Sequence, residues 1–385
     1  LPLIRARHDA IAHLIDLPTL RMDLRDALRR APDLDRALSR LALDRGGPRD
    51  LAAVRDALSQ AMWIASELGD GPPNVLATAR QDLSGHDALV ALLDTALVAE
   101  PHVHVRDGGF VAPGFDADLD DACKLRDEGR SLIAAMQAEF VEQTGVPSLK
   151  VKHNNVLGYF IETTATHAEK MLSPPLNETF IHRQTTANAV RFTTVELSDL
   201  ETRILNAGAR VAEIENRVYS ALNAAVLDEA NRIAAAARAL AEVDLAAAQA
   251  ELAAQQDWCR PTVDDSRAFA IENGRHPVVE RALLAEGGAQ FIRNSCDLSA
   301  SDNAAIWLVT GPNMAGKSTF LRQIALIALL AQAGCYVPAD SAHIGLVSQI
   351  FSRVGASDDL ARGRSTFMVE MVETAAILNQ ADDRA

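Results

Sequence analysis

The sequence predicts a multidomain, mainly α-helical protein with a long helical lever, a small inserted β module and a C-terminal α/β domain. Three observations support this prediction. Apolar residues recur every three or four positions through most of residues 1–147 and 195–260, which is the period of an amphipathic helix. Residues 148–194 change to the alternation typical of strands. Residues 261–385 combine strand-like runs with a glycine-bounded loop and a further helix, as α/β domains do.

The composition is that of a globular chain with room for two or three domains. Hydrophobic residues make up 48% and charged residues 23% of the 385 positions. The sequence contains no run of about 18 apolar residues, so it predicts no membrane span. The first residues lack a secretory signal and an initiator Met, so we expect a cytoplasmic chain that begins inside a longer protein. The cysteines lie far apart without metal-ligand spacing, and we expect reduced thiols at Cys123, Cys259, Cys296 and Cys335.

Residues 1–147 are predicted to form the first part of a helical core. Pro48 stands where a first helical turn begins, and a further helix is expected from Asp116 to about Thr144. Between these helices, alternating residues from Val103 to Gly114 surround Asp107-Gly108-Gly109. That pattern favours a β-hairpin.

Residues 148–194 are predicted to form the β module, with strand-like segments at 149–152, 158–163, 179–183 and 190–194. The whole chain has a net charge of −15, which by itself argues against nucleic-acid binding. From Leu149 to Thr193, however, five bases stand against three acids, a balance of +2. A basic module suits contact with DNA phosphates; the alternative is a solvated hairpin with incidental charge. The candidate DNA-binding residues are Lys150, Lys152, Asn154, Asn155, Arg183, Gln184, Asn188 and Arg191.

Residues 195–260 contain the longest periodic segment of the chain. From Leu197 to Ala225 apolar residues alternate in steps of three and four, a seven-residue repeat held over four heptads. A helix of some 60 residues would reach roughly 90 Å, which predicts a lever returning from the β module to the core. The alternative is a pair of ordinary helices with a break near Gly208.

Residues 261–385 are predicted to form a nucleotide-binding domain. An apolar run at 306–309 predicts a buried strand, and a helix with apolar period follows from Phe320. The loop between them fits Gly-x-x-x-x-Gly-Lys-Ser/Thr, in which backbone N–H groups surround a polyphosphate. Lys317 would contact the β- and γ-phosphates of ATP, and Ser318 would bind Mg²⁺. The candidate nucleotide-binding residues of this loop are Gly311, Pro312, Asn313, Met314, Ala315, Gly316, Lys317, Ser318 and Thr319.

A second glycine- and serine-rich segment runs from Gly355 to Met371, after a predicted strand at 350–354. Its Ser365-Thr366 pair suits a helix N-terminus, where anions bind; a plain helix cap is the alternative. No apolar strand ending in Asp-Glu follows Met371, although such an acid holds Mg²⁺ in P-loop domains. We therefore expect the nucleotide domain to be incomplete within this sequence.

Together the loop at Gly311 to Thr319 and the segment at Gly355 to Met371 resemble the MutS family of DNA mismatch-repair ATPases. Further resemblance lies in Arg275 to Glu280, Val105 to Gly109 and Asn154 to Tyr159. The resemblance covers essentially the whole chain. It implies a core or lever domain (1–147 and 195–260), a DNA clamp (148–194) and an ABC-type ATPase domain (261–385).

The same resemblance implies a homodimer that binds mispaired duplex DNA, uses ATP and Mg²⁺, and recruits a MutL-like partner. It implies that Phe291 stacks on the adenine and that Ser365 lies toward the partner subunit's nucleotide. The family's mismatch-reading domain and its second acidic motif are not in this sequence, so we expect weak DNA binding without mismatch preference and little or no ATP hydrolysis. Two alternatives are a coiled-coil ABC-type ATPase of chromosome maintenance and a non-catalytic DNA-clamp scaffold.

Overall fold

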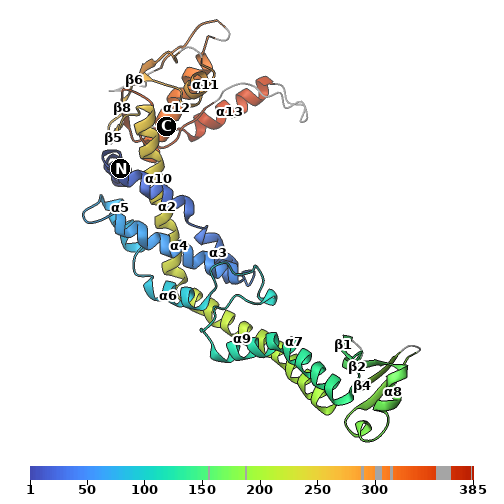
Figure 1. Ribbon diagram of the computed structural model, residues 1–385. Coiled ribbons are helices and arrows are strands. Elements are labelled where there is room, and N and C mark those ends of the chain that lie inside the picture. Colours follow the sequence, from blue (N-terminus) through green and yellow to red (C-terminus); the bar gives the residue numbers. More distant parts are fainter. Residues whose placement is uncertain are drawn as a thin grey trace. The chain divides into compact units, whose positions relative to one another are not determined.

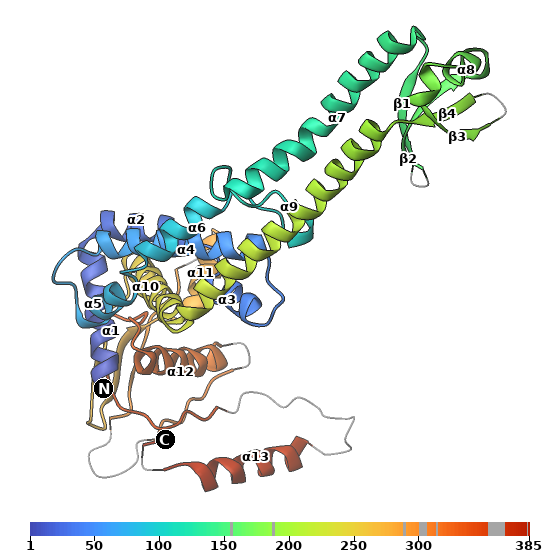
Figure 2. The ribbon, with the colours of Figure 1, turned by 90° about the horizontal axis from the view of Figure 1, so that it is seen from below.

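The computed structural model describes residues 1–154, 157–186, 189–287, 290–299, 306–312, 315–352, 366–382 and 384–385. The described chain is mainly helical and contains two four-stranded sheets (Figures 1 and 2). It divides into two compact units. Unit 1 comprises residues 1–32, 57–86 and 231–385, and unit 2 comprises residues 33–56 and 87–230.

Two long helices dominate unit 2: α7 (Ala117–Thr144) and α9 (Val195–Asp228) pack side by side (Figure 2). Each begins at a side-chain cap, because Asp116 accepts a hydrogen bond from the Leu119 N–H at 3.1 Å and Thr194 accepts one from the Leu197 N–H at 3.0 Å. The heptad stripe of α9 is buried from Leu197 to Val218 and then continues through Leu222 and Val226. The periodicity therefore predicted α7 with its bounds and the start of α9, but neither the end of α9 nor the last two contact positions.

The β module lies at the end of this helix pair (Figure 2). Its antiparallel sheet has the order β1-β2-β4-β3, and its strands are β1 (Lys150–Asn154), β2 (Gly158–Thr164), β3 (Ile181–Thr185) and β4 (Ala189–Thr193). Helix α8 (Ala165–Met171) and the 3₁₀ turn η2 (Leu176–Glu178) join β2 to β3. All four predicted strands are confirmed. The apolar side chains of the sheet share one core with α7, α8 and α9; its largest members include Phe140, Met171, Phe180, Ile161 and Phe192.

The remaining elements of unit 2 are α3 (Leu34–Ala42), the start of α4 (Pro48–Glu67), α6 (Asp87–Ala96) and the 3₁₀ turn η1 (Val105–Asp107). The predicted hairpin around Asp107-Gly108-Gly109 is wrong. The chain instead makes the η1 turn, and Glu215 of α9 accepts a hydrogen bond from the Gly109 N–H at 2.6 Å. This buried carboxylate satisfies a backbone donor that a hairpin would have given to a partner strand.

Unit 1 holds the other helices and the second sheet. This sheet has the order β5-β8-β6-β7, with β5 and β8 parallel and the other pairs antiparallel. Its strands are β5 (Thr262–Asp264), β6 (Phe269–Gly274), β7 (Asn294–Asp297) and β8 (Ser341–Gly345). The helices are α1 (Pro2–Asp16), α2 (Pro18–Arg30), most of α4, α5 (Asn74–Asp82), α10 (Ala230–Gln256), α11 (Pro277–Ala285), α12 (Lys317–Ala333) and α13 (Thr366–Gln380).

The segment at 195–260 is not one continuous helix. Helix α9 ends at Asp228 and α10 begins at Ala230, with Glu229 between them. The Glu229 N–H donates back to the Val226 carbonyl at 3.2 Å, a bond three residues back that closes the helix. The break near Gly208, the other possibility, is also absent, since Gly208 lies inside α9.

Two predicted strands of unit 1 do not form. Residues 306–310 have no strand geometry, and the side chains of Ile306 and Leu308 are 87% and 89% exposed. A buried parallel strand needs neighbours that supply its hydrogen bonds, and among the described residues no strand pairs with this segment. Residues 350–352 likewise form no strand, and the remainder of that predicted strand lies outside the described residues.

In the part of the chain that the structure describes, no helix has both the length and the apolar character required to cross a membrane.

Candidate functional site

The Gly311–Lys317 loop leads directly into helix α12. Gly311 has φ of 153° and Gly316 has φ of 82°, values that favour glycine. Lys317 is the first residue of α12, and Gly316 before it has no side chain with which to cap the first N–H groups. Such a helix start offers backbone donors and the positive dipole end to an anion.

The Lys317 side chain folds back across this loop. Its Nζ donates to the Gly311 carbonyl and to the Pro312 carbonyl, both at 2.6 Å. The ammonium group therefore lies beside the carbonyls of Gly311 and Pro312, and the oxygens of an incoming phosphate would replace these two acceptors. Ser318 follows on the first turn of α12 and is exposed. Lys317 and Ser318 thus suit a nucleotide phosphate and its Mg²⁺.

A pair of aromatic rings flanks the loop. Trp307 precedes it and Phe320 follows it, and their ring centroids lie 6.4 Å apart with planes only 17° from parallel. This stack was missed from the sequence because the two residues belong to different predicted elements. Phe291, the residue expected at the adenine, lies partly exposed in the irregular chain just before β7.

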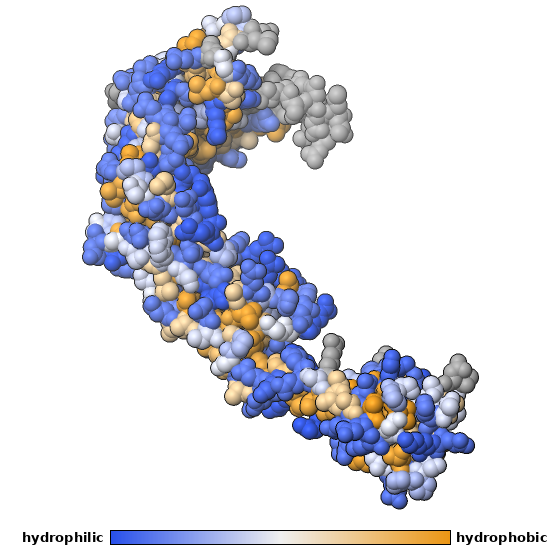
Figure 3. Space-filling model, viewed as in Figure 1, coloured by the Kyte–Doolittle hydropathy of each residue, from blue (hydrophilic) through white to orange (hydrophobic). Residues whose placement is uncertain are grey.

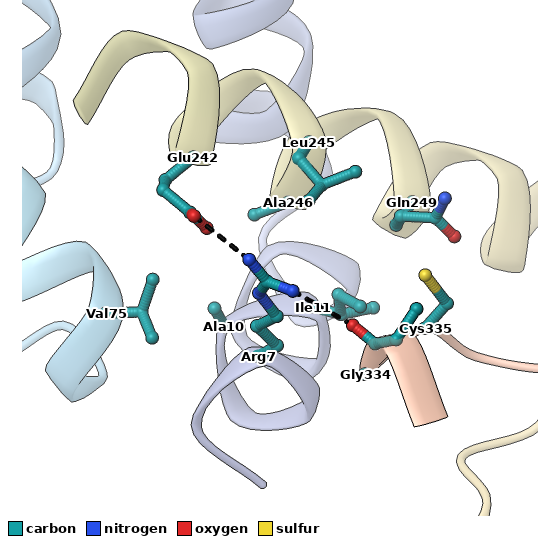
Figure 4. A pocket seen from close by; sticks show the side chains of 11 residues that line it. Arg7, Ala10, Ile11, Val75, Glu242, Leu245, Ala246, Gln249, Gly334 and Cys335 are labelled. Carbon is teal, nitrogen blue, oxygen red and sulfur yellow. Dashed lines mark hydrogen bonds and ion pairs between the residues drawn. The ribbon is translucent and has the colours of Figure 1, made fainter. Parts of the chain in front are cut away.

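The far end of α12 is held by the helical part of unit 1 (Figure 4). Arg7 of α1 donates to the Ala333 carbonyl at 3.1 Å and pairs with Glu242 of α10 at 3.0 Å. A small cavity of ≈ 10 Å³ adjoins them, room for about one water molecule. Gly334 ends α12 with φ of 82°, and a Cβ there would lie 3.1 Å from the Arg7 side chain. The helix that carries Lys317 at one end therefore packs tightly against α1 at the other.

The second candidate site is the polar face of the β1-β2-β4-β3 sheet. Cross-strand pairing places Lys150 opposite Glu162, and Glu162 opposite Arg191. Because strand side chains alternate between faces, Lys152 and Phe160, which also pair, share this side. We use the name polar face for the side that carries Lys150, Lys152, Phe160, Glu162 and Arg191.

One carboxylate organises the polar face. Glu162 Oε1 accepts from Lys152 Nζ at 2.6 Å, and Glu162 Oε2 accepts from Arg191 Nε at 3.2 Å. The hydrogen bond from Lys152, followed by that from Arg191, lowers the pKa of Glu162. The Arg191 guanidinium also lies 4.6 Å from the centroid of the Phe160 ring, a cation–π contact.

The other predicted DNA-binding residues surround this group. Arg191 Nη1 donates to Gln184 Oε1 at 2.9 Å, while Arg183 lies exposed on β3. Asn154 accepts a hydrogen bond from the Leu157 N–H at 2.7 Å. The predicted residues Asn155, Asn188, Asn313, Met314 and Ser365 lie outside the described residues.

Sequence reasoning missed the residue that contacts the backbone at the start of β2. Glu201 of α9 accepts a hydrogen bond from the Tyr159 N–H at 3.1 Å. Gly158 beside it has φ of 70°, and a Cβ at that position would overlap the Glu201 carboxylate. The only sequence signal was Gly158 itself, which marks a close approach without saying which side chain approaches.

Comparison with known proteins gives the family. Residues 114–210 match MutS family domain IV, and residues 307–385 match MutS domain V. The DNA mismatch repair proteins MutS of Ruegeria pomeroyi and Cereibacter sphaeroides are each 70% identical over the whole chain, and that of Paracoccus denitrificans is 69% identical over 99% of it. The chain spans 44%, 44% and 43% of the length of these relatives, in the same order. The chain belongs to the MutS family.

Proposed function

We propose that this chain supplies nucleotide-dependent binding of duplex DNA to a protein of DNA mismatch repair. The whole protein would act as a homodimer on mispaired DNA in the cytoplasm and recruit a MutL-like partner. The observation that carries the proposal is the phosphate-compatible loop at the uncapped start of α12, in a chain whose β module bears a cationic polar face. The names of the relatives support the process.

We assign residues 261–385 to an ATPase domain. The backbone from Gly311 to Thr319 would hold the phosphates, Lys317 would neutralise them, and Ser318 would bind Mg²⁺, which supplies charge neutralisation when present. Phe291 would stack on the adenine, and Ser365 would lie toward the nucleotide of the partner subunit. By itself the chain would turn ATP over slowly or not at all.

The assignment of the nucleotide-binding residues is tested by measuring the binding of a fluorescent ATP analogue to the wild type and to Lys317→Ala. We expect the variant to lose most of its affinity, because the loop loses its only lysine. Wild-type binding with no change in Lys317→Ala would contradict the assignment. A non-catalytic clamp scaffold, the competing function, would bind duplex DNA and no nucleotide.

We assign residues 148–194 to a clamp whose polar face contacts the phosphate backbone of DNA without reading its sequence. Lys150, Lys152, Arg183 and Arg191 would contribute charge, and Asn154, Asn155, Gln184 and Asn188 hydrogen bonds. The variant Lys152→Glu is expected to weaken duplex binding and flatten its salt dependence while nucleotide binding stays unchanged. Equal binding by both proteins across a salt series would refute the clamp assignment.

A further inference from the structure

The polar face carries a single acid among its bases. Within the four strands as the structure describes them, Glu162 is the only Asp or Glu. The same strands contain four bases: Lys150, Lys152, Arg183 and Arg191. The other two acids of the module, Glu169 and Glu178, belong to α8 and η2. An acid at the centre of a face proposed to bind a polyanion therefore needs a role.

Glu162 lies between bases on both neighbouring strands. Strand β2 pairs with β1 on one side and with β4 on the other, so Glu162 has Lys150 and Arg191 as its two cross-strand neighbours. Its two oxygens bind different cations, Lys152 at 2.6 Å and Arg191 at 3.2 Å. Only 18% of its side chain is exposed, against 51% for Lys152. The partly buried carboxylate thus stands where a phosphate would bind both cations.

We propose that Glu162 is an internal competitor for DNA phosphate that weakens the contact of the polar face with the duplex. This inference rests on the proposed clamp function. In the free protein the carboxylate holds the Lys152 and Arg191 side chains in place. On the duplex it repels the phosphates that these cations approach, so that each contact is weak and exchanges readily along the backbone.

Two measurable consequences follow. Removal of the Glu162 charge removes its repulsion of DNA phosphates that lie a few ångströms away. We therefore expect the affinity for duplex DNA to rise about threefold to tenfold at low salt. The removal also frees a cation for the DNA, and each additional phosphate contact steepens the dependence of log K on log salt by about 0.9. A purely structural role for Glu162 predicts the opposite, namely weaker binding once Arg191 loses its partner.

The test is a fluorescence-anisotropy titration of the full 385-residue chain with a short, fully paired duplex between about 50 and 200 mM salt. The proteins are the wild type, Glu162→Gln, Glu162→Asp and the control Glu169→Gln. The control makes the same charge change in the same module at Glu169, an exposed residue of helix α8 that lies outside the four strands. We expect tighter binding and a steeper salt slope for Glu162→Gln, intermediate binding for Glu162→Asp, and a change of less than about twofold for the control.

The inference is overturned if Glu162→Gln binds no more tightly than Glu169→Gln. Thermal melting of each variant detects a folding defect. If glutamine disturbs the sheet, Glu162→Asp gives a second comparison, because aspartate keeps the charge but holds it farther from the two cations. Failure of the clamp assignment looks different, because duplex binding would then be insensitive to Lys152→Glu as well.

Discussion

His8 makes the stability of unit 1 depend on pH between about 4 and 6.5. The residue lies on α1 with only 2% of its surface exposed, and its ring meets the Tyr336 ring edge-on at 6.1 Å. Its Nε2 has no hydrogen-bond partner among the described residues. Burial, and then the nearby charge of Arg260, lower the pKa of His8 from 6.5 to about 4. The fold therefore requires the neutral ring.

The direction and size of the effect follow from this shift. Because the pKa is lower in the folded state than in the unfolded chain, the unfolded chain takes up a proton first as the pH falls below 6.5. The stability contributed by neutral His8 is complete above that value and declines as the pH falls toward 4. Between pH 7.5 and 4.5 the free energy of unfolding falls by roughly 2 to 3 kcal/mol, at about 1.4 kcal/mol per pKa unit. Any solvent that reaches the ring reduces this loss.

The assay is urea unfolding, followed by circular dichroism across this pH range, of the wild type and of His8→Phe. Phenylalanine has a similar shape and keeps an aromatic edge for Tyr336 but does not titrate, so carboxylates elsewhere affect both proteins alike. Hydrogen exchange in α1 gives a local reading of the same equilibrium. We expect the wild type to lose roughly 2 kcal/mol more than the variant between pH 7.5 and 4.5. Parallel pH dependences would refute the reasoning.

Three further substitutions test the packing of each unit. Glu215→Ala should destabilise unit 2 by about 1–3 kcal/mol in urea unfolding, because the Gly109 N–H loses its charged acceptor. Glu215→Gln keeps an acceptor and should cost less, and equal losses would contradict this account. Gly334→Ala should lower the stability of unit 1 by about 1–3 kcal/mol, since φ of 82° and the 3.1 Å approach of Arg7 disfavour a side chain; Gly287→Ala, also at positive φ but with open space around it, is the control for strain alone. Gly129→Val should push α7 away from α9 and lower the melting temperature, because a Cβ there would lie 2.8 Å from Ile204. Gly208→Val, where the space is open, is the control, and equal melting temperatures for the two variants would exclude the close contact.

Local sequence patterns predicted the elements of unit 2 well. Helix α7 follows the Asp116 cap and ends at Thr144, just before Gly145, as its apolar period and flanking residues indicate. The strands of the β module are five to seven residues long, and in β4 partly buried and buried positions alternate over the first four residues, a period of two that also shows in the sequence. Each of these signals comes from neighbours within a few positions, which is why the sequence alone was sufficient.

Contacts between distant residues were beyond such patterns. The turn at Gly109 depends on Glu215, 106 positions later, and the hairpin pattern therefore misled. The exposed run at Ile306 has the composition of a buried strand, but burial depends on partner strands that its own residues do not encode. At the candidate sites the chemistry of Lys317 and Lys152 was predictable, whereas the pairing of Lys152 and Arg191 with one carboxylate required the register of three strands.

The anchoring of α12 at its C-terminal end determines how that helix can respond to a ligand. With Gly334 seated on α1 and the Ala333 carbonyl bonded to Arg7, this end has little room to shift. Any tilt of α12 must then pivot at this end. The 17 residues of the helix are about 25 Å long at 1.5 Å each, so Lys317 lies about 25 Å from the pivot. A rotation of a few degrees at the pivot becomes a displacement on the order of 2 Å at Lys317, enough to exchange one hydrogen-bond partner for another.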